Sequence, residues 1–140
     1  MRSFFGAKSR FRIHRLLGIC SLFFLLSKCI LYEIRIEGLS REDILLLGRI
    51  GAVFGLFSFF TGGGLGKFLS DKRSKIAEVH TILMLAGLIL QTPSLGEDSQ
   101  NYITIFLSWI GMVLLLSGWM YGRRVFDRFP FRRKPESVKN

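Results

Sequence analysis

The chain has 140 residues, of which 20 are Lys or Arg and 10 are Asp or Glu, so its formal net charge is +10. Because 49% of the residues are hydrophobic, the composition excludes a disordered chain, and two cysteines are too few for a disulfide scaffold. The apolar residues fall in four long blocks with the charges between them, whereas the helices of a soluble bundle would each carry a polar stripe. This arrangement predicts an all-α polytopic membrane protein.

Each of the four apolar blocks is long enough to cross a hydrocarbon core, which takes about 17–25 mostly apolar residues in a helix. Helices are expected because lipid offers no partners for open backbone N–H and C=O groups. We expect spans at residues 16–32, 44–61, 76–92 and 102–122, between a basic N-terminal tail (1–15) and a basic, aromatic C-terminal tail (123–140). The chain then forms a single membrane domain, in which we identify no internal repeat.

The charges of the loops predict the orientation of these spans. Lys and Arg concentrate in the N-terminal tail, the second loop and the C-terminal tail, whereas the first loop carries more acids and the third has no positive residue. By the positive-inside rule, both termini face the cytoplasm or the mitochondrial matrix, in a bacterial plasma membrane or a mitochondrial inner membrane. The acid-free N-terminal segment also fits a mitochondrial targeting segment or a secretory n-region, but the four-span charge pattern favours an uncleaved first helix.

The C-terminal tail alternates Phe with basic residues directly after a span. This pattern suits the headgroup level of a membrane, with Phe at the acyl boundary and Arg on anionic phosphates, and the position favours lipid over RNA as the partner. We therefore expect bound anionic lipids and no nucleic acid. The candidate headgroup ligands are Arg123, Arg124, Arg128, Arg132, Arg133 and Lys134.

Three ionisable residues within the spans are functional candidates, because a charge in lipid is costly. Lys28 lies near the outer end of the first span, where its ammonium group would snorkel outward to water. Arg49 lies about one turn inside the second span, within reach of two acids at the start of that span. Glu78 begins the third span at the inner face, where it would pair with Lys75 or face water.

His14 and His80 are the only two histidines of the chain. The first and third spans both run from the inside outward, so both histidines lie near the inner interface. Two histidines on neighbouring helices can ligate one haem, although histidine is also common at interfaces. The pair is therefore our candidate cofactor site for the haem alternative.

No catalytic constellation is evident, and we expect a protein that is not an enzyme. The spans carry no deep carboxylate of the kind that a proton-coupled exporter needs, and the ligands are too few for zinc. Cys20 and Cys29 are about 13.5 Å apart along one helix and face opposite sides, so they cannot form a disulfide.

Glycines provide the clearest packing signal. Gly48, Gly51 and Gly55 line the second span, and Gly111 and Gly118 lie on the fourth. The Gly51-x-x-x-Gly55 spacing lets two helices approach closely. These faces fit packing within the bundle or docking onto another membrane protein.

The first span contains Arg15-Leu-Leu-Gly18 and then Phe23-Phe24-Leu-Leu-Ser27-Lys28, and the fourth contains IGMVLLLSGWMYGRR. These segments resemble the first and last helices of the DoxX-like family of small four-helix membrane proteins. The second span departs from the family's pattern, since it has Arg49 and glycines where the family often has an acid. The resemblance implies a redox role with a quinone or thiol partner, with Arg15 and Lys28 as the matched polar positions.

Three functional hypotheses follow. The first is a non-catalytic accessory subunit of a larger inner-membrane complex, respiratory or otherwise energy-transducing, whose partners are other membrane subunits. The second is a DoxX-like redox-associated protein that works with a quinone or a thiol. The third is a membrane anchor that carries haem between His14 and His80.

Overall fold

The chain folds into four long helices in this computed structural model, which describes residues 7–34, 37–63, 71–96 and 101–126. The helices are α1 (Ala7–Ile34), α2 (Arg41–Gly62), α3 (Asp71–Gln91) and α4 (Tyr102–Phe126), and a short 3-10 helix, η2 (Thr92–Leu95), follows α3. No strand occurs in these ranges, and all four helices are long and apolar enough to cross a membrane. The all-α, four-span prediction is confirmed.

The helices extend beyond the expected spans. α1 begins at Ala7, so residues 7–15 of the expected N-terminal tail are helical, and α4 continues to Phe126 in the expected C-terminal tail. The apolar windows accordingly lie within Ser9–Ile34 and Tyr102–Arg124. Arg and Lys are good helix formers whose charged ends reach the headgroup layer, so a helix need not stop where its apolar block stops.

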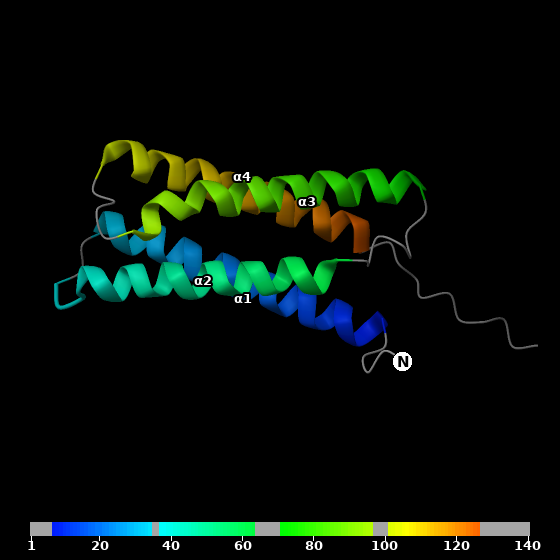
Figure 1. Cartoon of the computed structure of the whole chain (residues 1–140), viewed down its shortest axis with the longest axis horizontal. Coiled ribbons are helices and arrows are strands. Elements are labelled where there is room, and N and C mark those ends of the chain that lie inside the picture. The colour runs from blue at the N-terminus through cyan, green and yellow to red at the C-terminus, as the bar shows by residue number, and fades with distance from the viewer. Residues whose placement is uncertain (1–6, 35–36, 64–70, 97–100, 127–140) are drawn as a thin grey trace, which may run out of the picture.

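Successive helices run in opposite directions, so α1 and α3 begin at the end where α2 and α4 finish (Figure 1). We call this the inner end and the opposite one the outer end. α1 packs along α2 and α3 packs along α4, giving two helical hairpins with far fewer contacts between them. A small core of Leu22, Leu25, Met112 and Leu115 joins α1 to α4. Large apolar side chains such as Phe23 and Phe60 point outward, as lipid contact requires.

The glycines of α2 and α4 lie in contacts within this bundle. A Cβ on Gly51 would lie 3.0 Å from the backbone N of Leu25 in α1, and a Cβ on Gly111 would lie 2.8 Å from the carbonyl oxygen of Gly87 in α3. Gly55, Gly48 and Gly118 similarly face Leu88, Lys28 and Met84. Their expected packing role is thus visible in the fold, while docking onto another protein stays a prediction.

Some buried residues recur at matched positions in the two hairpins, a recurring packing pattern that the sequence analysis did not identify. Buried residues recur at the same spacing in α1 and in α3 with η2: Ser21, Leu25 and Lys28 match Gly87, Gln91 and Ser94. Those of α2 and α4 match likewise: Gly48, Gly51, Gly55 and Ser58 with Ser108, Gly111, Leu115 and Gly118. The matched pairs of identical residues include His14/His80, Leu17/Leu83, Leu22/Leu88, Gly51/Gly111 and Gly62/Gly122. Both hairpins run in the same direction, as in a parallel repeat of a membrane protein.

Candidate functional site

The His14 ring is held between α1 and the last turn of α2. Its Nδ1 lies 2.8 Å from the carbonyl oxygen of Ser58, and the Ser58 hydroxyl in turn donates to the His14 carbonyl oxygen at 3.2 Å. The ring fits because the residue one turn beyond Ser58 is glycine: a Cβ on Gly62 would lie 2.7 Å from His14 Cε1. The His14 ring can therefore lie here only because residue 62 has no side chain.

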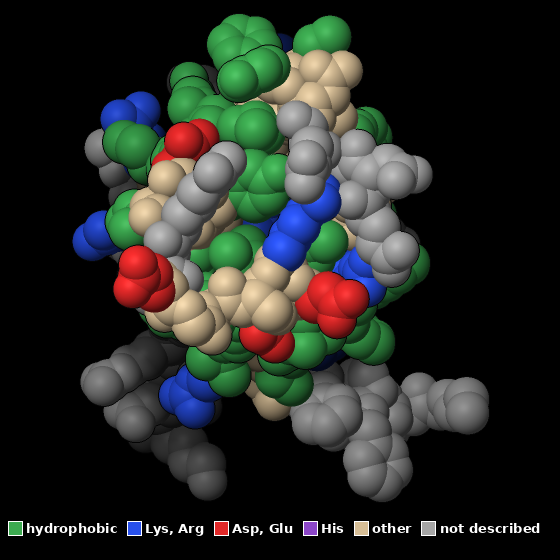
Figure 2. All heavy atoms as spheres, turned by 90° about the vertical axis from the view of Figure 1, so that its left-hand side faces the viewer, with side chains coloured by type: hydrophobic (Ala, Val, Ile, Leu, Met, Phe, Trp, Pro, Cys, Tyr) green, Lys and Arg blue, Asp and Glu red, His purple; other side chains and the backbone are tan. Residues whose placement is uncertain are grey.

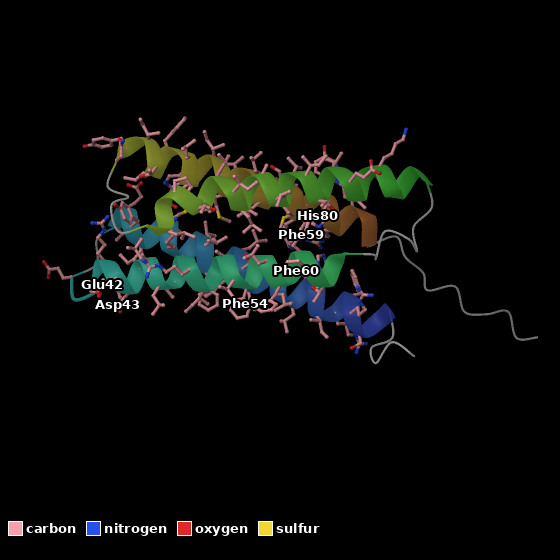
Figure 3. All side chains as sticks on the ribbon, viewed as in Figure 1. Glu42, Asp43, Phe54, Phe59, Phe60 and His80 are labelled. Atoms are coloured by element: carbon pink, nitrogen blue, oxygen red, sulfur yellow. The ribbon has the colours of Figure 1, made fainter. Side chains whose placement is uncertain are left out.

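His80 is held in the same way between α3 and the last turns of α4. Its Nδ1 lies 2.7 Å from the carbonyl oxygen of Gly118, and a Cβ on Gly122, one turn further along, would lie 2.8 Å from both His80 Cε1 and Nδ1. The matched positions of the two hairpins therefore build two equivalent histidine seats at the inner end. His80 lies in the same half of the bundle as Phe59 and Phe60 near the end of α2 (Figure 3).

The hydrogen bonds determine which nitrogen of each ring can bind a metal. A carbonyl oxygen can only accept a hydrogen bond, so both Nδ1 atoms must carry hydrogen and the neutral rings have their lone pairs at Nε2. Histidines that ligate metals usually donate their other ring N–H to a carbonyl or carboxylate oxygen, which fixes the tautomer and the orientation of the ring. Both histidines are in this state.

The two rings also lie close together. Their centroids are 6.2 Å apart and their planes are at 89°, an edge-to-face arrangement of two rings. A metal ion held by both Nε2 atoms, with bonds of about 2.0 Å, would place the two centroids at most about 6.3 Å apart. In the described residues, no group of three or more His, Cys, Asp or Glu side chains converges on a metal position.

Basic residues also lie at the inner end of the bundle. Arg10, one turn before His14, donates from Nη2 to the carbonyl oxygen of Gly63 at 2.8 Å. At the end of α4, the guanidinium groups of Arg123 and Arg124 lie 5.9 Å from the ring centroids of Trp119 and Tyr121. The expected headgroup ligands Arg128, Arg132, Arg133 and Lys134 lie outside the described residues.

Lys28 does not snorkel to water, which corrects our expectation. Its side chain is only 2% exposed, and its Nζ donates to Gln91 Oε1 at 3.1 Å, to Ser108 Oγ at 3.0 Å and to Ser94 Oγ. A polar cluster at the outer end of the bundle therefore holds the ammonium inside. Gln91 completes this cluster by donating from Nε2 to the carbonyl oxygen of Ser108 at 2.8 Å.

The other two intramembrane candidates lie near the surface. Arg49 is exposed and donates from Nε to the carbonyl oxygen of Leu95 at 3.3 Å, at the end of η2. Glu78 is exposed at the inner end, where it faces the surroundings of the bundle. Neither residue joins the histidine pair or the Lys28 cluster in the hydrogen bonds described here.

Some of the residues that build these two sites were missed by sequence reasoning. Gln91 and Ser94 belong to the Lys28 cluster, and Ser58 with Gly62 and Gly122 belongs to the histidine seats. His14 precedes Gly62 by 48 residues and His80 precedes Gly122 by 42, so the two His–Gly pairs share no fixed spacing in the sequence and become comparable only once the hairpins are aligned.

The comparisons with known proteins assign neither a family nor a function to this chain. No family model matches the chain, and no curated protein and no solved structure is significantly similar to it. The resemblance to the DoxX-like family thus stays a prediction, and the function must be argued from the geometry.

Proposed function

We propose that this protein is a haem-bearing membrane protein in which His14 and His80 would hold the iron. The observation that carries the proposal is the pair of oriented rings, 6.2 Å apart between centroids, with each Nδ1 bonded to a backbone carbonyl. Two protein ligands suit haem because the porphyrin supplies the other four. The loosely connected hairpins favour this assignment, since a flat macrocycle between the rings would lie between the hairpins.

The chemistry that such a site supports is electron transfer. With an imidazole on each side, the iron would have no open position for oxygen or a substrate, so the group would change its oxidation state without binding a reactant. Arg10, Arg123 and Arg124 at the inner end provide cations for the propionates. A haem-bearing anchor is compatible with the hypothesis of an accessory subunit in an energy-transducing membrane, and the partner subunits remain to be identified by co-purification.

The direct test is the absorption spectrum of the protein purified in mild detergent and loaded with hemin. We expect a Soret band and a sharp α band after reduction with dithionite, as for a six-coordinate haem with two histidines. Replacing His14 or His80 with Ala should each abolish the six-coordinate spectrum, since the chain has no other histidine. Thr81→Ala, at the exposed position next to His80, should leave the spectrum unchanged.

The proposal is wrong if the folded protein takes up no hemin, or if both single histidine variants retain the six-coordinate spectrum. Circular dichroism and the elution volume of each variant show whether the fold is retained. The fold of each variant must be checked because the histidines also hold α1 to α2 and α3 to α4, so a lost spectrum could result from unfolding.

A further inference from the structure

The hydrogen bonds of the outer cluster suit a charged Lys28. The Ser94 hydroxyl donates to the Gln91 carbonyl oxygen at 2.7 Å, and the Ser108 hydroxyl donates to Gln91 Oε1 at 2.8 Å. In this arrangement both hydroxyl oxygens accept from Lys28 Nζ, as Gln91 Oε1 does. The three acceptors match the three N–H groups of an ammonium ion.

Among the residues that the structure describes, this ammonium has only neutral hydrogen-bond partners. Among the described carboxylates, none is bonded to Lys28, and Glu33 on the same helix instead accepts from Trp109 Nε1 at 3.2 Å. A buried charge without a counter-charge is costly, particularly within a membrane. An anion next to Lys28 would remove much of that cost.

A small pocket, partly open at the surface, lies beside the ammonium. It lies between α1 and α4, and η2 closes it from a third side. Its wall consists of Lys28, Cys29, Tyr32, Ser94, Ile105, Ser108 and Trp109. Figure 2 views this end of the bundle, where acidic and basic side chains stand around a partly hydrophobic centre. The pocket thus joins one cation and two hydroxyls to apolar and aromatic walls.

Comparison of the two hairpins indicates that this cluster is a specialised site. At the inner end the hairpins share a histidine and a glycine, and they differ at Ser58/Gly118; at the outer end they differ at Leu25/Gln91, Lys28/Ser94 and Gly48/Ser108, where one hairpin carries a charge and the other three polar groups. The second hairpin supplies the polar partners, and the first supplies the cation and the room for it. A Cβ on Gly48 would lie 2.6 Å from Lys28 Cδ.

We propose that this pocket binds the carboxylate of a single-chain amphiphile such as a fatty acid, entering from the outer leaflet. The pocket has room for little more than a water-sized group, so only a small head group can approach the ammonium. Phe106 and Ile110, exposed on α4 next to the lining residues Ile105 and Trp109, offer a surface for the alkyl chain. The hydroxyl of Ser94 or Ser108 turns its hydrogen from Gln91 to the carboxylate, while its oxygen continues to accept from Lys28. This assignment does not depend on haem.

The test measures binding to the full-length protein in phosphatidylcholine nanodiscs, with empty nanodiscs subtracted. Dodecanoate should bind about tenfold or more tightly than dodecanol, because its carboxylate accepts a charge-assisted hydrogen bond from the serine hydroxyl and lies beside the Lys28 ammonium. Lys28→Met should remove this preference, and Lys75→Met, at an exposed lysine of α3, should keep it. Equal affinity for the acid and the alcohol would overturn the proposal, as would acetate binding as tightly as dodecanoate, which would indicate a soluble acid.

A second measurement keeps the test valid if Lys28→Met does not fold. Cys29 lines the pocket and lies 3.3 Å from Ser108 Oγ. In a Cys20→Ala background, dodecanoate should slow the modification of Cys29 by a small methanethiosulfonate reagent, and dodecanol should not. Equal rates with and without dodecanoate would refute the site, while the haem spectrum of the same sample reports separately on the histidine pair.

Discussion

The substitution Gly122→Ala tests the histidine geometry while both histidines stay in place. A Cβ at this position would lie 2.8 Å from Cε1 and Nδ1 of His80, whereas ordinary van der Waals contact begins at 3.4 Å. The ring must therefore retreat by about 0.6 Å, a shift that acts directly on its hydrogen bond of 2.7 Å to Gly118. A metal–nitrogen bond of about 2.0 Å does not stretch by that amount.

The expected magnitude follows from the role of this hydrogen bond. Loss of the group that orients a ligating histidine typically lowers metal affinity about 10–100-fold. We expect the dissociation constant for hemin to rise by that factor in Gly122→Ala. The same rise is expected in Gly62→Ala, whose Cβ would lie 2.7 Å from His14 Cε1. Titration with hemin, followed at the Soret band, measures both constants.

Gly96→Ala is the matched control, since among the described atoms a Cβ there would come within 4 Å of the Pro93 carbonyl oxygen alone, at 3.9 Å. It should bind hemin like the unmodified protein. The reasoning is refuted if Gly122→Ala and Gly62→Ala stay folded by circular dichroism and bind hemin as tightly as Gly96→Ala. In that case the rings do not ligate the iron in the arrangement described here.

Three further predictions concern the spectrum and the stability of the fold. The ring planes of His14 and His80 at 89° predict a strongly anisotropic low-spin electron paramagnetic resonance signal for the ferric haem protein, and the rhombic signal of parallel rings would contradict them. Gly51→Leu should lower the free energy of unfolding in detergent by about 1–3 kcal/mol, because the side chain is forced against the backbone of α1. Val53→Leu, at an exposed position of the same helix, should leave it unchanged within error. Hemin at 100 times its dissociation constant should stabilise the protein by about 2.7 kcal/mol, and in His14→Ala this stabilisation should be lost.

The number and placement of the spans could be predicted because they depend on composition over many residues. Each apolar block is long enough to cross a hydrocarbon core. The basic segments all lie on the side of the membrane that the positive-inside rule assigns to the inside. The helix ends could not be predicted in the same way. Arg10 and Arg12 look like part of a tail in the sequence, but their helical conformation costs little and their charges reach the headgroup layer.

The environment of Lys28 could not be predicted, because its partners come from distant parts of the chain. Gln91 and Ser94 follow it by 63 and 66 residues, and Ser108 by 80. Hydropathy places a lysine near a membrane surface by default, and snorkelling is the usual outcome there. Only the tertiary structure shows that three oxygens meet at one point inside the bundle.

The histidine pair was proposed from its depth in the membrane, but the features that make it a credible ligand set are backbone features. A carbonyl acceptor is available at every residue, so Ser58 and Gly118 carry no sequence signature as partners of Nδ1. What the sequence does record is the glycine one turn later in each hairpin, Gly62 and Gly122. In the sequence these two glycines cannot be distinguished from the many glycines that membrane helices use for packing.

The recurring packing pattern of the two hairpins connects these observations. Two hairpins that run in the same direction place equivalent residues at equal depth. Each hairpin has one histidine near its start, so both histidines lie at the inner end. Each hairpin then offers one histidine. Under the proposed function, an iron held by His14 and His80 would join two halves that otherwise contact each other sparsely. At the outer end the matched positions carry different residues, Lys28 and Ser94. This end can therefore bind a different ligand.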